Sequence, residues 1–134
     1  ARVPAGLLAL AVSPDGGRLA VGGDDKIVRL FAPDGRELAA LPGHAGAVRS
    51  LAFHPDGSTL ASAAESGPVR LWSADRTGPD RALTPGRTEY RSVTFHPDGT
   101  RLALGGQGGA AAVVRLADGA VEKAWTAHRN TVLA

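Results

Sequence analysis

The amino-acid sequence predicts an all-β fold made of one unit of about 42 residues that is used three times. A turn element, Ser or His followed by Pro-Asp-Gly, occurs at 13–16, 54–57 and 96–99, and its prolines are 41 and 42 residues apart. Short apolar runs lie between these turns and are separated by clusters of Pro, Gly and Asp. Such runs are typical of β-strands and leave no room for a long helix.

Each unit is expected to hold four consecutive antiparallel strands. The first strand comes just before the Pro-Asp-Gly turn and the second just after it, because Pro fixes φ, Asp can bond the following backbone and Gly accepts a positive φ. Apolar runs of the first strand are at 10–12, 51–53 and 93–95, and those of the second at 18–21, 59–62 and 101–104. The third strand is expected at 28–31, 69–72 and 113–116, and the fourth at 37–41 and 121–125.

Four antiparallel strands per period are typical of one blade of a β-propeller. The chain resembles WD40 repeats over nearly its whole length. The second unit carries the resemblance on Gly43-His44, Val48, Ser50, Phe53, Pro55-Asp56-Gly57, Leu60-Ala61-Ser62 and Val69-Arg70-Leu71-Trp72. The resemblance implies a β-propeller fragment of three four-stranded antiparallel blades, part of a larger ring of about seven blades.

Residues 1–134 are accordingly expected to form a partial WD40 propeller. Blade 1 spans about 5–43, blade 2 about 44–86 and blade 3 about 87–127, and 128–134 form the first strand of a further blade. The chain opens with Ala1 and contains no Met, so we expect it to be a processed product or a piece of a longer protein. Its open apolar faces would be covered by further blades of the same parent chain or, alternatively, by other copies.

The resemblance also implies a structural hydrogen-bond tetrad of His, Ser or Thr, Asp and Trp within a blade. In the second unit His44, Ser62 and Trp72 stand at three of these positions. Ser66 stands where the Asp is expected, so this tetrad is incomplete.

The other units depart further from the pattern. The first unit supplies Asp25 at the turn position but has Val21 in place of Ser and Phe31 in place of Trp. His128 lies 84 residues after His44, which is two periods, and is expected to be the tetrad histidine of the next blade.

Composition excludes several classes of function. Fifteen Lys and Arg against 13 Asp and Glu give a net charge of +2, too small to indicate a nucleic-acid or anionic-membrane partner. The absence of Cys excludes disulfides, thiolate zinc sites and Cys nucleophiles. No apolar run has the length of a membrane span and no signal peptide is recognisable, so we expect no membrane partner. The compartment stays open, with a preference for the cytoplasm.

No metal, cofactor or catalytic site is expected. Beyond the tetrad positions, His54 and His96 should lie at corners of neighbouring blades, too far apart to share an ion. The glycine-rich segment 105–109 lacks the Lys-Ser/Thr of a phosphate loop and is interpreted as a slack hairpin turn. No serine lies in a Gly-x-Ser-x-Gly elbow, so the chain is not expected to be an enzyme.

A set of charged residues is predicted to lie at one end of the blades, around the mouth of the central channel. The set is Arg49, Arg91, Arg87, Glu89, Glu65, Lys26 and Arg129. Arginine makes fork-like contacts with carboxylate or phosphate, which suits this face to gripping a partner. The alternative is that these are solvated charges paired with Glu89 or Glu65.

The sequence therefore predicts a protein-protein interaction scaffold that binds a peptide or protein on its channel-mouth face. Near-equivalent loops give such a repeat protein a broad surface without a unique pocket. The alternatives are a segment that assembles into a ring from several copies, a propeller enzyme, or a nucleic-acid binder.

Overall fold

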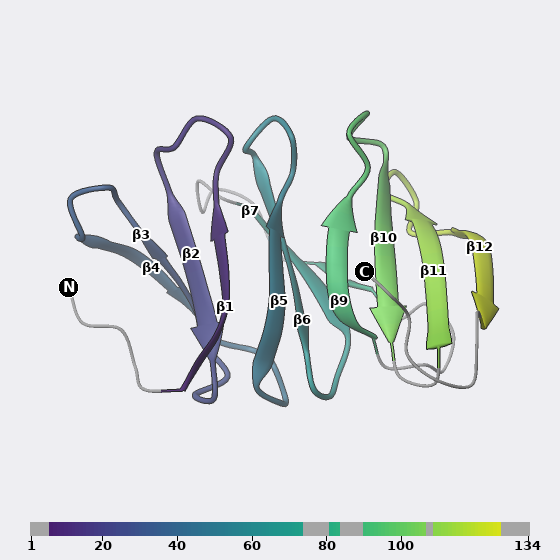
Figure 1. Ribbon diagram of the computed structural model, residues 1–134. Helices are drawn as coiled ribbons and strands as arrows, with labels where there is room; N and C mark the ends of the chain where they lie inside the picture. Colours follow the sequence, from purple (N-terminus) through teal and green to yellow (C-terminus); the bar gives the residue numbers. More distant parts are fainter. Residues whose placement is uncertain (1–5, 74–80, 84–89, 107–108, 127–134) are drawn as a thin grey trace.

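Twelve strands form three four-stranded antiparallel sheets, as expected from the sequence. The computed structural model describes residues 6–73, 81–83, 90–106 and 109–126, and contains no α-helix in these ranges. Each strand pairs with its neighbours in sequence, in the orders β1-β2-β3-β4, β5-β6-β7-β8 and β9-β10-β11-β12. Figure 1 shows the three sheets side by side in chain order. The predicted all-β fold is confirmed.

Sheets 1 to 3 are defined by the following strands. Sheet 1 holds β1 (Leu7–Val12), β2 (Leu19–Gly23), β3 (Val28–Phe31) and β4 (Glu37–Leu41). Sheet 2 holds β5 (Val48–Phe53), β6 (Thr59–Ala64), β7 (Val69–Ser73) and β8 (Arg81–Leu83). Sheet 3 holds β9 (Tyr90–Phe95), β10 (Arg101–Gly106), β11 (Ala110–Arg115) and β12 (Val121–Thr126).

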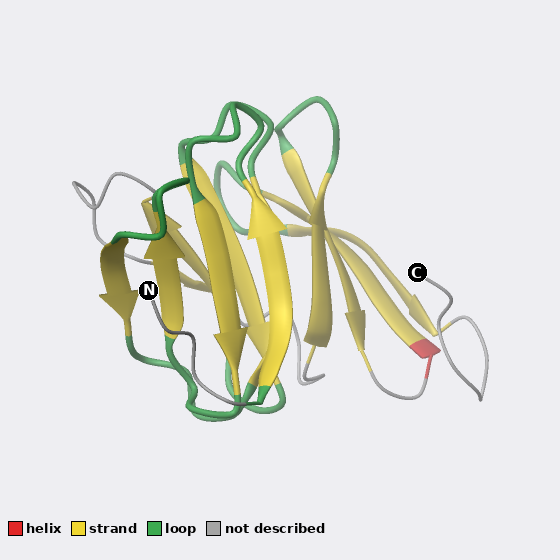
Figure 2. Ribbon diagram, turned by 60° about the vertical axis from the view of Figure 1, so that its left-hand side comes forward, coloured by secondary structure: helices red, strands yellow, loops and turns green. Residues whose placement is uncertain are grey.

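The Pro-Asp-Gly segments form tight turns between the first two strands of each sheet. Gly16, Gly57 and Gly99 have φ of 73°, 77° and 75°, which is the left-handed region that glycine tolerates best. Each of these glycines donates its N–H to the carbonyl three residues earlier, at 2.8 to 2.9 Å. All three turns lie at the same end of the sheets, at the top of Figure 1, which we call the corner end; Figure 2 shows the molecule turned by 60°. The opposite end, with the β2–β3 and β6–β7 turns, is the mouth end.

Apolar side chains fill the space between successive sheets. One buried cluster joins sheets 1 and 2, and includes Val28 and Leu30 from sheet 1 with Leu60 and Trp72 from sheet 2. A second cluster joins sheets 2 and 3 through residues such as Leu71 and Leu102. Burial of these aliphatic groups supplies the main driving force for stacking the sheets.

The first strands of the sheets also contact one another through a polar side chain. Ser50 in β5 accepts a hydrogen bond from the backbone N–H of Val93 in β9 at 3.1 Å. Gly22 in β2 faces Val48 of β5, and a Cβ atom at Gly22 would lie only 2.6 Å from a Val48 methyl carbon. The stacking of sheets 1 and 2 therefore depends on the absence of a side chain at this position.

Two details differ from the sequence prediction. A fourth strand was expected in sheet 2 but was not located in the sequence, because the three residues of β8, Arg81–Leu83, are too few to give an apolar pattern. The predicted slack turn at 105–109 is wrong at its start, since β10 continues to Gly106. Gly105 pairs with both Ser92 and Ala111, so this glycine belongs to the strand ladder.

The outer face of sheet 1 carries exposed apolar side chains. Leu8, Leu10 and Val12 alternate along β1 and are 41%, 58% and 59% exposed, whereas Ala9 between them is buried against sheet 2. The three exposed side chains thus point away from sheet 2. Among the described residues there is no helix long and apolar enough to cross a membrane.

Candidate functional site

His44, Ser62 and Trp72 meet in the interior of sheet 2. His44 lies in the segment before β5, Ser62 is in β6 and Trp72 in β7. The Ser62 Oγ atom is 2.6 Å from His44 Nε2 and accepts a hydrogen bond from Trp72 Nε1 at 2.7 Å. All three residues are buried. The loop, the second strand and the third strand are thereby joined through one hydroxyl group.

Among the described residues, the fourth position of this tetrad supplies no hydrogen-bond acceptor for His44. The buried Nδ1 atom of His44 has no hydrogen-bond partner in the described structure. Ser66, at the position of the expected Asp, instead lies close to Gly46. Burial lowers the pKa of His44 to about 4, and the positive charge of Arg70 acts in the same direction. His44 is therefore neutral near pH 7.

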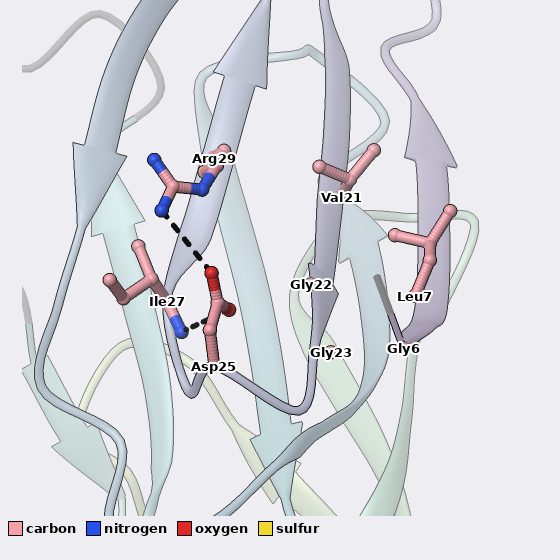
Figure 3. Close-up of a pocket in the computed structure, with 8 residues that line it drawn as sticks. All are labelled: Gly6, Leu7, Val21, Gly22, Gly23, Asp25, Ile27 and Arg29. Carbon is pink, nitrogen blue, oxygen red and sulfur yellow. Dashed lines mark hydrogen bonds and ion pairs between the residues drawn. The ribbon is translucent and has the colours of Figure 1, made fainter. Parts of the chain in front are cut away.

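Sheet 1 replaces this arrangement with an ion pair (Figure 3). Asp25 accepts a hydrogen bond from the Ile27 N–H at 3.2 Å and pairs with Arg29 at 3.2 Å. Val21 stands where sheet 2 has Ser62, so no hydroxyl group is available. The small hollow between these residues has a volume of about 10 Å³, which is room for about one water molecule. The structure does not bring Asp25 to any histidine among the described residues.

The candidate binding face is only partly within the described chain. Arg49 in β5 is exposed and donates from Nε to Glu65 at 2.9 Å, and its Nη2 atom also contacts Glu65. This pairing agrees with the alternative interpretation of the two residues as a surface ion pair. Lys26 is exposed at the tip of the β2–β3 turn, with a φ of 69°. Arg91 is half-buried in β9.

The remaining predicted site residues lie outside the described residues. These are Arg87, Glu89, His128 and Arg129. The described members are Arg49, Glu65, Lys26 and Arg91. The first three lie at the mouth end of sheets 1 and 2, and Arg91 is the second residue of β9 in sheet 3.

A contact between sheets 2 and 3 at the corner end was missed by the sequence analysis. His54, at the corner end of sheet 2, reaches the corner of sheet 3, where its Nε2 atom is 2.8 Å from the Gly99 carbonyl oxygen. Its ring also packs edge-on against Phe95, with centroids 5.2 Å apart. The sequence feature that could have indicated this contact is the residue before Pro-Asp-Gly, which is Ser at 13 but His at 54 and 96. No cluster of three potential metal ligands occurs among the described residues.

The stacked four-stranded sheets define a segment of a β-propeller. The family signature described as WD domain, G-beta repeat, matches residues 4–32 and 35–73, which together make up half of the chain. The chain therefore belongs to the WD40 repeat family.

Two solved structures resemble nearly the whole chain. The structure of U3-55K and the crystal structure of RRP9 WD40 repeats each align with a TM-score of 0.88 at 21% identity. Each alignment covers 97% of this chain and 42% of the solved chain. At this identity the likeness establishes the fold, a WD40 propeller.

Curated relatives match over shorter stretches. Nuclear distribution protein nudF 2 of Talaromyces marneffei is 40% identical over 60 residues, which is 45% of this chain and 13% of that protein. The U5 small nuclear ribonucleoprotein 40 kDa protein of Homo sapiens is 43% identical over 58 residues, 42% of this chain and 16% of that protein. The chain thus matches less than a fifth of the length of these relatives. WD40 propellers typically serve as protein-interaction scaffolds.

Proposed function

We propose that this chain is part of a protein-interaction scaffold that binds a peptide or protein partner on its mouth end. The observation that carries the proposal is the position of Arg49, Glu65 and Lys26, which come from two different sheets and lie at one end of the stack. Arg49 and Glu65 are 42% and 39% exposed in their side chains, so each can exchange its surface partner for a ligand. Arg87, Glu89, Arg91 and Arg129 are proposed to complete this face.

We further propose that His44, Ser62 and Trp72 are structural and that the chain is not an enzyme. The Ser62 hydroxyl is fully buried and already bonds Trp72, so it cannot meet a substrate without opening the sheet. His44 Nδ1 has no orienting carboxylate in the described chain, which a catalytic Ser-His pair requires. Both features favour a role in holding sheet 2 together.

A peptide-library selection against the protein, followed by calorimetric titration of the selected peptide, tests the proposed face. Arg49→Ala and Lys26→Ala should each weaken binding about tenfold, because they remove charge-assisted contacts. Arg36→Ala is the matched control, since Arg36 is an exposed arginine at the corner end of sheet 1. Binding that resists both mouth-end substitutions but is lost with Arg36→Ala would overturn the proposal.

Association with a further blade is a second candidate, favoured by the exposed Leu8, Leu10 and Val12 on β1. The blade would come from the same parent chain or from another copy. Light scattering should show the isolated chain to be associated, and Leu10→Asp should shift it toward the monomer. A well-behaved monomer before any substitution would contradict this candidate.

A further inference from the structure

We propose that a groove between sheets 2 and 3 at the corner end binds an acidic peptide segment, with Arg81 as the residue that holds its carboxylate. The groove has a volume of about 500 Å³, within the range of peptide side-chain and small-molecule sites. It is a second surface, separate from the proposed mouth-end face.

Strand pairing fixes the place of the groove. Arg81 in β8 pairs with Leu71 in β7, and Ser73 at the end of β7 pairs with Thr59 at the start of β6, next to the Pro-Asp-Gly turn. Leu116 follows β11 directly, and its N–H bonds to the Thr100 carbonyl at 3.0 Å, beside the corresponding turn of sheet 3. The groove therefore opens at the end of the sheets opposite to Arg49 and Glu65.

Arg81 crosses the boundary between the two sheets. Its Nη1 atom donates to the Leu116 carbonyl oxygen at 3.0 Å, and its Nη2 atom lies near Gly119 in the β11–β12 turn. The guanidinium group has five N–H donors, so this single bond leaves most of them available to a ligand. A side chain anchored at one end in this way loses less conformational entropy when it binds.

Arg81 also differs from the well-paired arginines of the chain. Arg29, Arg101 and Arg115 each hold a carboxylate, and the nearby Asp118 is taken by Arg115 at 2.6 and 3.1 Å. No carboxylate of the described residues lies within 4 Å of Arg81. A groove-edge cation with no carboxylate within 4 Å among the described residues favours a ligand that brings the negative charge.

Besides Arg81, the groove is lined by apolar side chains and by the hydroxyl groups of Ser58, Thr59 and Ser73. Leu71 and Leu116 contribute aliphatic surface, and Leu71 is part of the core between sheets 2 and 3. His54 and Gly99 form the wall at the corner, held by the 2.8 Å contact between the His54 Nε2 atom and the Gly99 carbonyl oxygen. One cation beside an apolar floor fits an aspartate or glutamate next to an aliphatic side chain. A nucleic acid would need several cations to hold successive phosphates.

Fluorescence anisotropy with a labelled peptide of alternating glutamate and leucine tests this proposal in the whole protein. Arg81→Gln should weaken binding about tenfold, and binding should fall with added salt. Peptides with glutamine for glutamate, or serine for leucine, should bind more weakly than the parent peptide. Arg81→Glu should bind a lysine-leucine peptide in preference to the glutamate peptide.

Two matched variants locate the binding site. Arg36→Gln removes an exposed arginine of sheet 1, and Arg49→Gln removes one from the mouth end, so neither should change the affinity. Thermal unfolding of Arg81→Gln, monitored by circular dichroism, should match that of the unsubstituted protein, since the side chain is exposed. Loss of binding in Arg49→Gln but not in Arg81→Gln would overturn the groove while leaving the mouth-end proposal intact.

Three further results would also overturn the inference. These are no binding of the glutamate peptide, equal binding of the glutamine peptide, and Arg81-dependent binding of single-stranded RNA without binding of the peptide.

Discussion

At the scale of single residues, the group around His44 explains how a divergent repeat keeps its blade together. Ser62 still joins His44 to Trp72 through bonds of 2.6 and 2.7 Å. The missing partner leaves His44 Nδ1 buried without a hydrogen bond. An unsatisfied buried polar atom lowers the free energy of unfolding by roughly 1–3 kcal/mol. A single substitution that supplies an acceptor for His44 Nδ1 should therefore stabilise the protein.

Ser66→Asp should stabilise the protein, because a carboxylate at this position can accept a hydrogen bond from Nδ1–H of His44. We expect the free energy of unfolding to rise by about 1 kcal/mol or more, measured by urea denaturation. The gain should vanish when His44 is replaced by Gln. An equal gain in the His44→Gln background would show that the aspartate acts elsewhere.

Stability should depend on pH through His44. The folded pKa is about 4, below the ordinary 6.5, so between these values the unfolded chain binds a proton that the folded chain does not. The contribution of neutral His44 is complete above pH 6.5 and is lost as the pH falls toward 4. We expect a loss of roughly 2 kcal/mol across this window.

Urea denaturation at several pH values checks this dependence. His44→Gln should flatten the profile in that window, because it removes the group whose pKa differs between the folded and unfolded chain. An equally steep profile in His44→Gln would contradict the assignment.

At the scale of elements, the Pro-Asp-Gly turns are similar in backbone but differ in what surrounds them. Gly16 and Gly99 share nearly the same φ, 73° and 75°. A Cβ at Gly16 would meet no atom within 4 Å, whereas one at Gly99 would lie 2.7 Å from His54 Cε1. The third turn is therefore a contact between sheets as well as a hairpin.

Gly99→Ala should destabilise the protein more than Gly16→Ala. Both substitutions add the strain of a positive φ, about 1 kcal/mol, but only Gly99→Ala displaces the His54 ring. We expect an additional loss of about 1–2 kcal/mol in thermal or urea unfolding. Equal losses of stability in the two variants would show that the His54 ring does not contact Gly99 in solution.

At the scale of the whole molecule, the stacking of sheets depends on close approach between the first two strands of neighbouring sheets. Gly22 leaves room for Val48, whereas a Cβ atom at the equivalent Gly105 of sheet 3 would lie 3.7 Å from the Ser92 Cβ atom, an ordinary van der Waals contact. The same residue type thus has two different roles in equivalent strands.

Gly22→Ala should lower stability by about 1–3 kcal/mol, because the new methyl group overlaps the Val48 side chain. Gly105→Ala should be neutral or slightly stabilising, since the added methyl fits and the unfolded chain loses freedom. Differential scanning calorimetry of both variants checks this. Similar effects of the two substitutions would contradict the described packing of sheet 1 against sheet 2.

Much of the fold follows from local sequence. The Pro-Asp-Gly period predicted four strands in each of three units, and the apolar runs located eleven of them, because turn chemistry and alternation are local properties. The position of β8 was not found because three residues carry no period, and the turn at 105–109 was placed too early because Gly105 pairs in the ladder.

The site was predicted less completely than the fold. The family pattern indicated that His44, Ser62 and Trp72 belong together, since their spacing is local to one blade. The crossing of His54 to Gly99 and that of Arg81 to Leu116 join residues 45 and 35 positions apart and depend on how sheets stack, which no short pattern encodes. The proposed mouth-end face stays a prediction.

The stacking of separate sheets is tested most directly by nuclear Overhauser effects between them. The account predicts cross-peaks between the Val48 methyl groups and the Gly22 Hα protons, and between the His54 ring and the Gly99 Hα protons. Spectra in which each sheet shows only its internal cross-peaks, with none linking Val48 to Gly22 or His54 to Gly99, would contradict it.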